Sequence, residues 1–107
     1  RKNIITQNIH DQIFSPMWNE FGIPGQKLLS VIATKNNNKD WANINEIIDE
    51  YIKQGDNSSE NSIHNLGDTL QAADLLERQD NSFRITVPLY QLWVQKRKPC
   101  PIVFSVT

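Results

Sequence analysis

The chain has 107 residues, of which 21% are charged and 38% hydrophobic, and its net charge is −1. This length allows one hydrophobic core but not two, and the composition is that of an ordinary globular domain. No apolar run approaches the roughly 20 residues that cross a membrane, which argues against a membrane-spanning protein. The single cysteine, Cys100, cannot form an intramolecular disulfide and favours a reducing cytoplasm. Because the chain begins at Arg1 and not at methionine, we expect a segment of a longer protein.

Charge is unevenly distributed along the chain. Residues 1–43 hold 5 basic and 3 acidic side chains, residues 44–77 hold 1 and 8, and residues 78–107 hold 5 and 1. The middle third is therefore strongly acidic. Since nucleic-acid backbones are bound through Lys and Arg, this third has the wrong charge for such a partner.

The first third of the chain predicts helices. Residues 1–14 carry isoleucines and a phenylalanine at helical spacing, which predicts an entry helix or a linker from an upstream domain. The pair Ser15-Pro16 has the form of a helix start, with a capping serine and a proline at the first helical position. That helix should end at Gly22, and Pro24 should begin the next one.

The middle of the chain predicts two amphipathic helices. Asn43 and Glu46 stand three apart, as in a capping box at a helix start. Apolar residues follow at the strongest helical period in the sequence, and Gly55 should end this helix. A further helix is expected over residues 62–76. The inward faces of the two helices are expected to hold Ile44, Ile47, Ile48, Tyr51, Ile52, Ile63, Leu66, Leu70 and Ala73.

A β-hairpin is predicted after these helices. Apolar and polar side chains alternate over residues 83–87 with the period of two that marks a half-buried strand. The preceding Gln-Asp-Asn-Ser at 79–82 consists of residues that favour chain reversal. The sequence therefore predicts that residues 83–87 pair with the segment before the turn.

A helix from Pro88 to Lys98 should follow, because proline suits the first helical turn better than a continuing strand. Tyr90 lies one step off the apolar face and is the best candidate for an exposed aromatic residue. Residues 102–106 have β composition and could form an edge strand or a linker. The inward face of the helix is expected to hold Leu89, Leu92 and Trp93.

Helices that lead into a hairpin of this size are the pattern of a winged helix, which is an α+β fold. We expect four or five helices and a two-stranded hairpin, which residues 102–106 could join as a third strand. The expected divisions are an entry helix or linker over 1–14, the winged-helix domain over 15–98 and a C-terminal strand or linker over 99–107.

The sequence contains no motif for catalysis, metal binding or nucleotide binding. Neither His10 nor His64 has a cysteine or second histidine at metal-ligand spacing. Cys100 stands between two prolines without the partners of a nucleophile. The four glycines are too scattered for a phosphate-binding loop. We therefore expect no enzyme activity, cofactor or metal in this segment.

The helix expected over residues 62–76 occupies the place that enters the major groove in a DNA-reading winged helix. Such a helix needs Arg or Lys for phosphates and Arg, Asn or Gln for base edges. Its outward positions hold no basic residue, and its carboxylates would repel the backbone. These positions are Asn61, His64, Asn65, Asp68, Gln71, Asp74 and Glu77. The remaining candidates for nucleic-acid or partner contacts are Arg78, Arg84, Tyr90, Lys96, Arg97 and Lys98. The last three also complement the dipole at a helix C-terminus, which requires no ligand.

Residues 68–94 resemble the winged-helix domain that follows the ATPase core in many bacterial AAA+ proteins and STAND-type, NACHT-like signal-transduction ATPases. The resemblance rests on the Leu-Leu pair at 75–76, the Phe-Arg-Ile-Thr-Val-Pro strand at 83–88 and the helix that carries Trp93. It extends over most of residues 10–96.

This resemblance implies a regulatory module that packs on the ATPase core, while ATP and Mg²⁺ belong to the parent protein. In one branch of the family a histidine after the wing strand reaches the nucleotide, but Pro88 stands there in this chain. The family's glycine before the Leu-Leu pair is replaced by Asp74, which we expect in a left-handed conformation. The sequence thus favours a non-catalytic protein-interaction module of a cytoplasmic signal-transduction ATPase. The alternative is a DNA-binding winged-helix transcriptional regulator.

Overall fold

The computed structural model describes the backbone of residues 2–36 and 41–105, and the side chains of this part from residue 11 onward. In these residues the helices are α1 (Lys2–Glu20), α2 (Gly22–Lys35), α3 (Ile44–Lys53), α4 (Glu60–Ala72), α5 (Pro88–Arg97) and α6 (Cys100–Ser105). The strands are β1 (Ala42–Asn43), β2 (Leu76–Gln79) and β3 (Ser82–Ile85). The protein is thus helix-rich, with a small antiparallel sheet. Among the described residues, no helix is both long and apolar enough to cross a bilayer.

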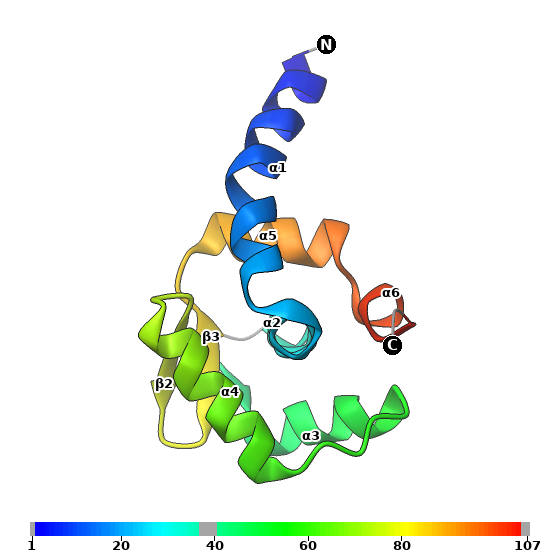
Figure 1. The fold of residues 1–107 in the computed structure, drawn as a ribbon, viewed down its shortest axis with the longest axis vertical. Coiled ribbons are helices and arrows are strands. Elements are labelled where there is room, and N and C mark those ends of the chain that lie inside the picture. The colour runs from blue at the N-terminus through cyan, green and yellow to red at the C-terminus, as the bar shows by residue number, and fades with distance from the viewer. Residues whose placement is uncertain (1, 37–40, 106–107) are drawn as a thin grey trace.

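Helix α2 is the centre of the fold. Figure 1 shows it nearly end-on, with α5 on one side, α3 on the other and α6 at its flank. Its side chains Leu28, Leu29, Val31 and Ile32 are fully buried. Burial of apolar surface around one helix supplies the main favourable free energy of folding. The other helices therefore depend on α2 for their positions.

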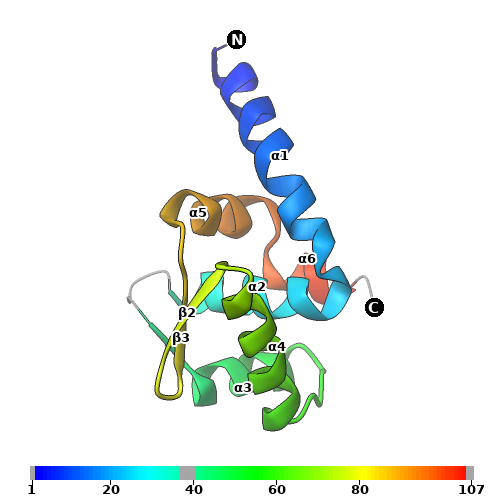
Figure 2. The same cartoon turned by 60° about the vertical axis from the view of Figure 1, so that its left-hand side comes forward.

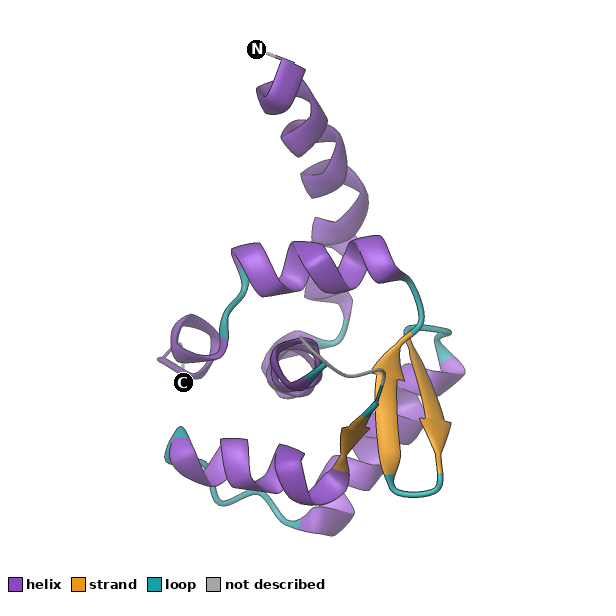
Figure 3. Cartoon of the chain, turned by 180° about the vertical axis from the view of Figure 1, so that it is seen from behind, coloured by secondary structure: helices purple, strands orange, loops and turns teal. Residues whose placement is uncertain are grey.

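The sheet has the strand order β1-β3-β2. Ala42 of β1 is opposite Phe83 of β3, and Leu76 of β2 is opposite Ile85. Figure 3 shows the sheet from behind, with the short β1 at one edge and the β2–β3 hairpin beside it. The predicted hairpin is confirmed. Its turn contains Asp80 at φ 54°, a left-handed conformation that aspartate tolerates.

Residues 102–106 were expected to form an edge strand or a linker. The strand is wrong for residues 102–105, which are helical, and Val106 lies outside the described residues. Residues 100–105 form α6, because Cys100, Val103 and Phe104 share one helical face that is buried. Pro101 fits in the first turn of this helix, where its missing donor costs little. The third strand of the sheet is β1, which the sequence analysis did not predict.

The predicted start of α3 is confirmed in detail. The backbone nitrogen of Asn45 donates to Asn43 Oδ1 at 2.8 Å, and the nitrogen of Asn43 donates to Glu46 Oε1 at 3.1 Å. This reciprocal pair is a capping box. Gly55 follows the end of the helix at φ 83°, as expected for a glycine in that place. Within the expected inward faces of α3 and α4, however, Ile52 and Ala73 are exposed.

The expected helix start at Ser15-Pro16 is wrong. Helix α1 continues through Pro16 to Glu20, and α2 begins at Gly22, not at Pro24. A proline inside a helix removes one hydrogen bond and costs about 3 kcal/mol. Phe14 and Trp18 lie on either side of this proline and are both buried, so packing against α5 offsets the cost. Figure 2 shows the N-terminal half of α1 extending away from the rest of the molecule.

Candidate functional site

Arg78 of the hairpin is held by groups of its own chain. Its Nη1 lies 2.8 Å from Asp68 Oδ1, and its Nη2 lies 3.2 Å from His64 Nδ1. Nε donates to the carbonyl oxygen of Asp80 at 3.1 Å, and the guanidinium lies over the ring of Phe83. The guanidinium that was predicted to contact a partner therefore bridges the hairpin and α4.

Arg84 is engaged in a similar way. Its Nε donates to Glu77 Oε1 at 2.7 Å, across the β2–β3 pair in which these residues are opposite each other. The guanidinium also lies 4.6 Å from the centre of the Trp41 ring, within the range of a cation–π contact. Both hairpin arginines thus have a carboxylate and an aromatic ring as neighbours.

The acidic face predicted for this helix is present only in part, because α4 ends at Ala72, so that Asp74 follows the helix and Glu77 lies on β2. Glu60 and Asp68 are exposed, and His64 lies between them on the helix with its Nε2 3.5 Å from Glu60 Oε2. The described helix contains no Lys or Arg. Asp74 lies just beyond the helix at φ 64°, which confirms the left-handed conformation expected from the resemblance. Helix α4 consequently carries the exposed carboxylates of Glu60 and Asp68 and no basic residue, and Asp68 is paired with Arg78 of the same chain.

The basic residues at the end of α5 do not form one patch. Arg97 Nη2 lies 3.5 Å from Asp11 Oδ2 on α1. Lys98 Nζ lies over the rings of Trp18 and Trp93, at 6.0 and 5.8 Å from their centres. Lys96 is exposed and has no ion pair or ring contact with a described residue. Two of the three cations therefore help to hold α1 against α5, and one is available at the surface.

The prediction that Tyr90 is exposed is wrong. Its exposed fraction is 0%, whereas Leu89 and Leu92 of the predicted inward face are 55% and 49% exposed. Tyr90 stacks on Trp93 with ring centres 5.9 Å apart and lies 5.2 Å from the ring of Phe14. Helix α5 packs against α1 as well as against α2. The face that is buried between these two helices contains Tyr90, Trp93 and Val94. Burial raises the pKa of Tyr90.

Because α5 buries this face and not the predicted one, it leaves exposed an apolar surface that the sequence analysis did not predict. We call it the α5 surface, and it consists of the exposed side chains of Val87, Leu89 and Leu92. The i, i+3 spacing of the two leucines defines one apolar face of the helix, and the sequence analysis assigned that face to the core. Tyr90 and Val94, four residues apart, define a second apolar face, and this was the signal that the helix has two candidate faces for burial.

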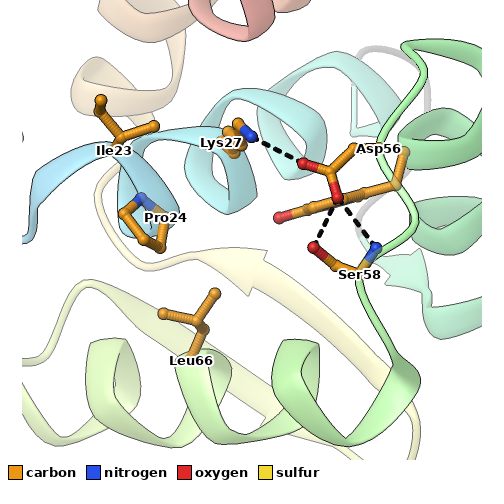
Figure 4. Close-up of a pocket in the computed structure, with 7 residues that line it drawn as sticks. Ile23, Pro24, Lys27, Asp56, Ser58 and Leu66 are labelled. Carbon is orange, nitrogen blue, oxygen red and sulfur yellow. Dashed lines mark hydrogen bonds and ion pairs between the residues drawn. The ribbon is translucent and has the colours of Figure 1, made fainter. Parts of the chain in front are cut away.

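A small pocket opens where the start of α2, the loop after α3 and α4 meet (Figure 4). Lys27 Nζ and Asp56 Oδ2 are 2.6 Å apart in it, and Ser58 donates to Asp56 Oδ1 through both its backbone nitrogen and its hydroxyl. Burial alone would raise the pKa of Asp56, but the hydrogen bonds from Lys27 and Ser58 outweigh it and lower the pKa. The lining residues are Ile23, Pro24, Lys27, Tyr51, Asp56, Ser58 and Leu66. No sequence motif pointed to this pocket, because its residues come from α2, α3, the loop after α3 and α4.

In the part of the chain that the structure describes, no group of three or more His, Cys, Asp or Glu side chains is placed to hold a metal ion. Cys100 is buried, with its Sγ near the hydroxyls of Ser30 and Thr34 at 3.5 and 3.4 Å. Comparisons of the chain with protein-family models, curated protein sequences and solved structures found no match.

Proposed function

We propose that the chain is a winged-helix module that binds protein and regulates a larger cytoplasmic ATPase of the AAA+ or STAND type. The element order from α2 to β3 and the strand order β1-β3-β2 support this classification, with α4 in the groove position and the β2–β3 hairpin as the wing. The resemblance of residues 68–94 to the module after such ATPase cores supports the parent class. The module itself is non-catalytic, and ATP and Mg²⁺ would be bound by the parent.

The pairing of both wing arginines with carboxylates of the same chain is the observation that carries the proposal. Arg78 is bound to Asp68, and Arg84 is bound to Glu77. Arg78 and Arg84 project from opposite faces of the hairpin, and on either face a duplex would meet a carboxylate together with the arginine, so little net attraction to phosphates would remain. A protein surface does not require such a positive field. The exposed α5 surface supplies apolar area of the kind found at the centre of protein interfaces.

The alternative, a DNA-binding winged-helix transcriptional regulator, requires the arginines to exchange carboxylates for phosphates. Exposed ion pairs contribute only about 0–1 kcal/mol, so breaking them is not prohibitive. The acidic face of α4 remains the stronger objection, because its charge cannot be removed by moving an arginine away.

Fluorescence anisotropy with a pool of random duplexes at low salt tests the two functions. We expect weak, non-selective binding, with an affinity no better than about 10⁻⁴ to 10⁻⁶ M. Submicromolar, sequence-selective binding that weakens steeply with salt and is abolished by Arg84→Glu would overturn the proposal. The Lys53→Glu variant makes the same charge change on the exposed end of α3 and serves as the control.

The parent class has a separate test. The coding sequence for about 300 residues upstream should contain a GxxxxGK[ST] loop, which binds nucleotide phosphates through its backbone amides and lysine. A long upstream reading frame without this motif would contradict the ATPase assignment and leave protein binding as the remaining proposal.

A further inference from the structure

The pocket at the start of α2 has a volume of about 100 Å³. In Figure 4, Ile23 and Pro24 come from α2, Leu66 comes from α4, and Asp56 and Ser58 come from the loop after α3. Since one water occupies about 30 Å³ of liquid, the space would hold about three waters, which is the size of a small functional group. The pocket is therefore a site for a small functional group and not for a whole metabolite.

The charged groups of the pocket neutralise each other. Lys27 and Asp56 form a 2.6 Å ion pair in which the side chains are only 14% and 16% exposed. Asp56 also accepts two hydrogen bonds from Ser58, which occupy its second oxygen. Because the pair has no net charge, it does not offset the cost of desolvating an anion or a cation in the pocket. The pair consequently favours a neutral occupant.

Tyr51 lines the pocket and carries a buried hydroxyl. This residue is buried on α3 and lines the pocket, and its Oη has no hydrogen-bond partner among the described residues. Burial, together with the charge of Asp56, raises the pKa of Tyr51, so the hydroxyl remains a neutral donor near pH 7. A buried polar group without a partner is unfavourable, and an acceptor that reached it would recover that free energy. Lys27 has further N–H donors besides the one directed at Asp56.

The remaining walls are apolar. Ile23, Pro24 and Leu66 offer aliphatic surface beside the two donors. An occupant that satisfies all of these groups has a carbonyl oxygen for the donors, a small aliphatic part for the walls and no net charge. A carboxamide has these three properties, and its oxygen is a stronger acceptor than that of an ester or a ketone.

We propose that this pocket binds a neutral carboxamide group, with Tyr51 and Lys27 donating to its oxygen. Two sources supply this chemistry: the side chain of Asn or Gln on a protein partner, and an acetylated amine. Either source would let the pocket recognise one group of a segment that lies across the junction of α2, α3 and α4. This inference does not depend on the proposed regulatory function.

Titration of the isotope-labelled full chain with acetamide and with N-methylacetamide, followed by NMR, tests the proposal. We expect saturable shifts at Lys27, Ser58 and Leu66, with dissociation constants on the order of 1–10 mM for groups of this size. Tighter binding of acetamide would indicate a side-chain amide, and tighter binding of N-methylacetamide would indicate an acetylated amine. Acetate, which has the same shape and a negative charge, should bind at least about tenfold more weakly because the neutral Lys27–Asp56 pair does not offset the cost of desolvating its charge.

Two conservative variants provide the decisive comparison. Tyr51→Phe removes only the hydroxyl and should weaken binding of the better amide about five- to tenfold. Tyr90→Phe removes the other buried hydroxyl that has no described partner, does not line the pocket and should leave binding unchanged. Leu66→Phe narrows the apolar wall and should also weaken binding. Absence of saturable shifts up to about 100 mM amide, equal binding by Tyr51→Phe, or acetate binding as tight as that of acetamide would overturn the proposal.

Discussion

Gly67 of α4 lies directly against the ring of Phe83 on β3. A Cβ atom at position 67 would be 2.5 Å from Cε1 and 2.9 Å from Cζ of that ring. Phe83 is fully buried, so its ring cannot move away without displacing other core side chains. The glycine weakens α4 as an isolated helix, but it allows the helix and the sheet to approach each other.

Replacement of Gly67 by alanine should therefore destabilise the protein. Helix propensity alone predicts a gain of about 1 kcal/mol, whereas overpacking a core contact costs typically about 1–3 kcal/mol. We expect the clash to prevail and the urea midpoint to fall. In a Phe83→Leu background, where the ring is gone, the same change should become neutral or stabilising. A rise in stability of Gly67→Ala in the native background would show that the contact between α4 and β3 is looser than described.

Two side-chain truncations distinguish the exposed face of α5 from its buried face. Leu89→Ala should change the free energy of unfolding by no more than about 0.5 kcal/mol, because the side chain is largely exposed. Tyr90→Ala should cost about 3–5 kcal/mol, as for other large buried aromatic side chains. Denaturant unfolding measures both. Equal costs, or a larger cost at Leu89, would mean that α5 is rotated toward the face expected from its sequence.

Asp11 should control the attachment of α1. Its Oδ1 accepts from Trp93 Nε1 at 2.8 Å, and its Oδ2 lies 3.5 Å from Arg97 Nη2. Asp11→Ala removes both contacts and should destabilise the protein by about 1–2 kcal/mol, with faster hydrogen exchange in α1. Asp11→Asn keeps an acceptor for the indole and should have a smaller effect. If the alanine variant leaves exchange in α1 unchanged, the aromatic contacts alone attach this helix.

Acid should destabilise the protein partly through Asp56 and Glu50. Hydrogen bonds from Lys27 and Ser58 to Asp56, and from Gln54 and Lys35 to Glu50, outweigh burial and lower the pKa of each carboxyl below its ordinary value of 3.8 or 4.5. A lowered folded-state pKa contributes stability that is fully present above the ordinary value and is lost as the pH falls through the folded value.

The double variant Asp56→Asn, Glu50→Gln should consequently lose less stability than the native chain between about pH 5 and pH 2. Unfolding in urea at several pH values measures this slope. Asp68→Asn, which removes one exposed carboxylate, is the matched control for the change in net charge. A slope that is identical in the native chain and the double variant would show that these two ion pairs do not contribute to acid sensitivity.

Sequence alone determined the features that depend on neighbouring residues. The capping box at Asn43 and Glu46 and the reversal at Asp80 were predicted correctly, as was the left-handed Asp74. Each of these follows from hydrogen bonds or backbone preferences that act over about four residues. Such interactions join residues that are close together in the sequence, so they can be predicted without knowledge of the rest of the fold. The outward position of Asp68 on α4 was predicted for the same reason, but Asp74 and Glu77 were wrongly expected on that helix.

Tertiary structure decided everything that required a choice between packing partners. Helix α5 has two apolar arcs, and only the position of α1 shows why Tyr90 is buried while Leu89 is exposed. Contacts of Phe14 and Trp18 with α5 likewise support a helix that continues through Pro16. Arg78 and Arg84 were correctly placed on the hairpin, but their carboxylate partners and the pocket around Tyr51 could not be predicted. Those contacts join residues from separate elements, and the free energy that selects them arises only when distant parts of the chain pack together.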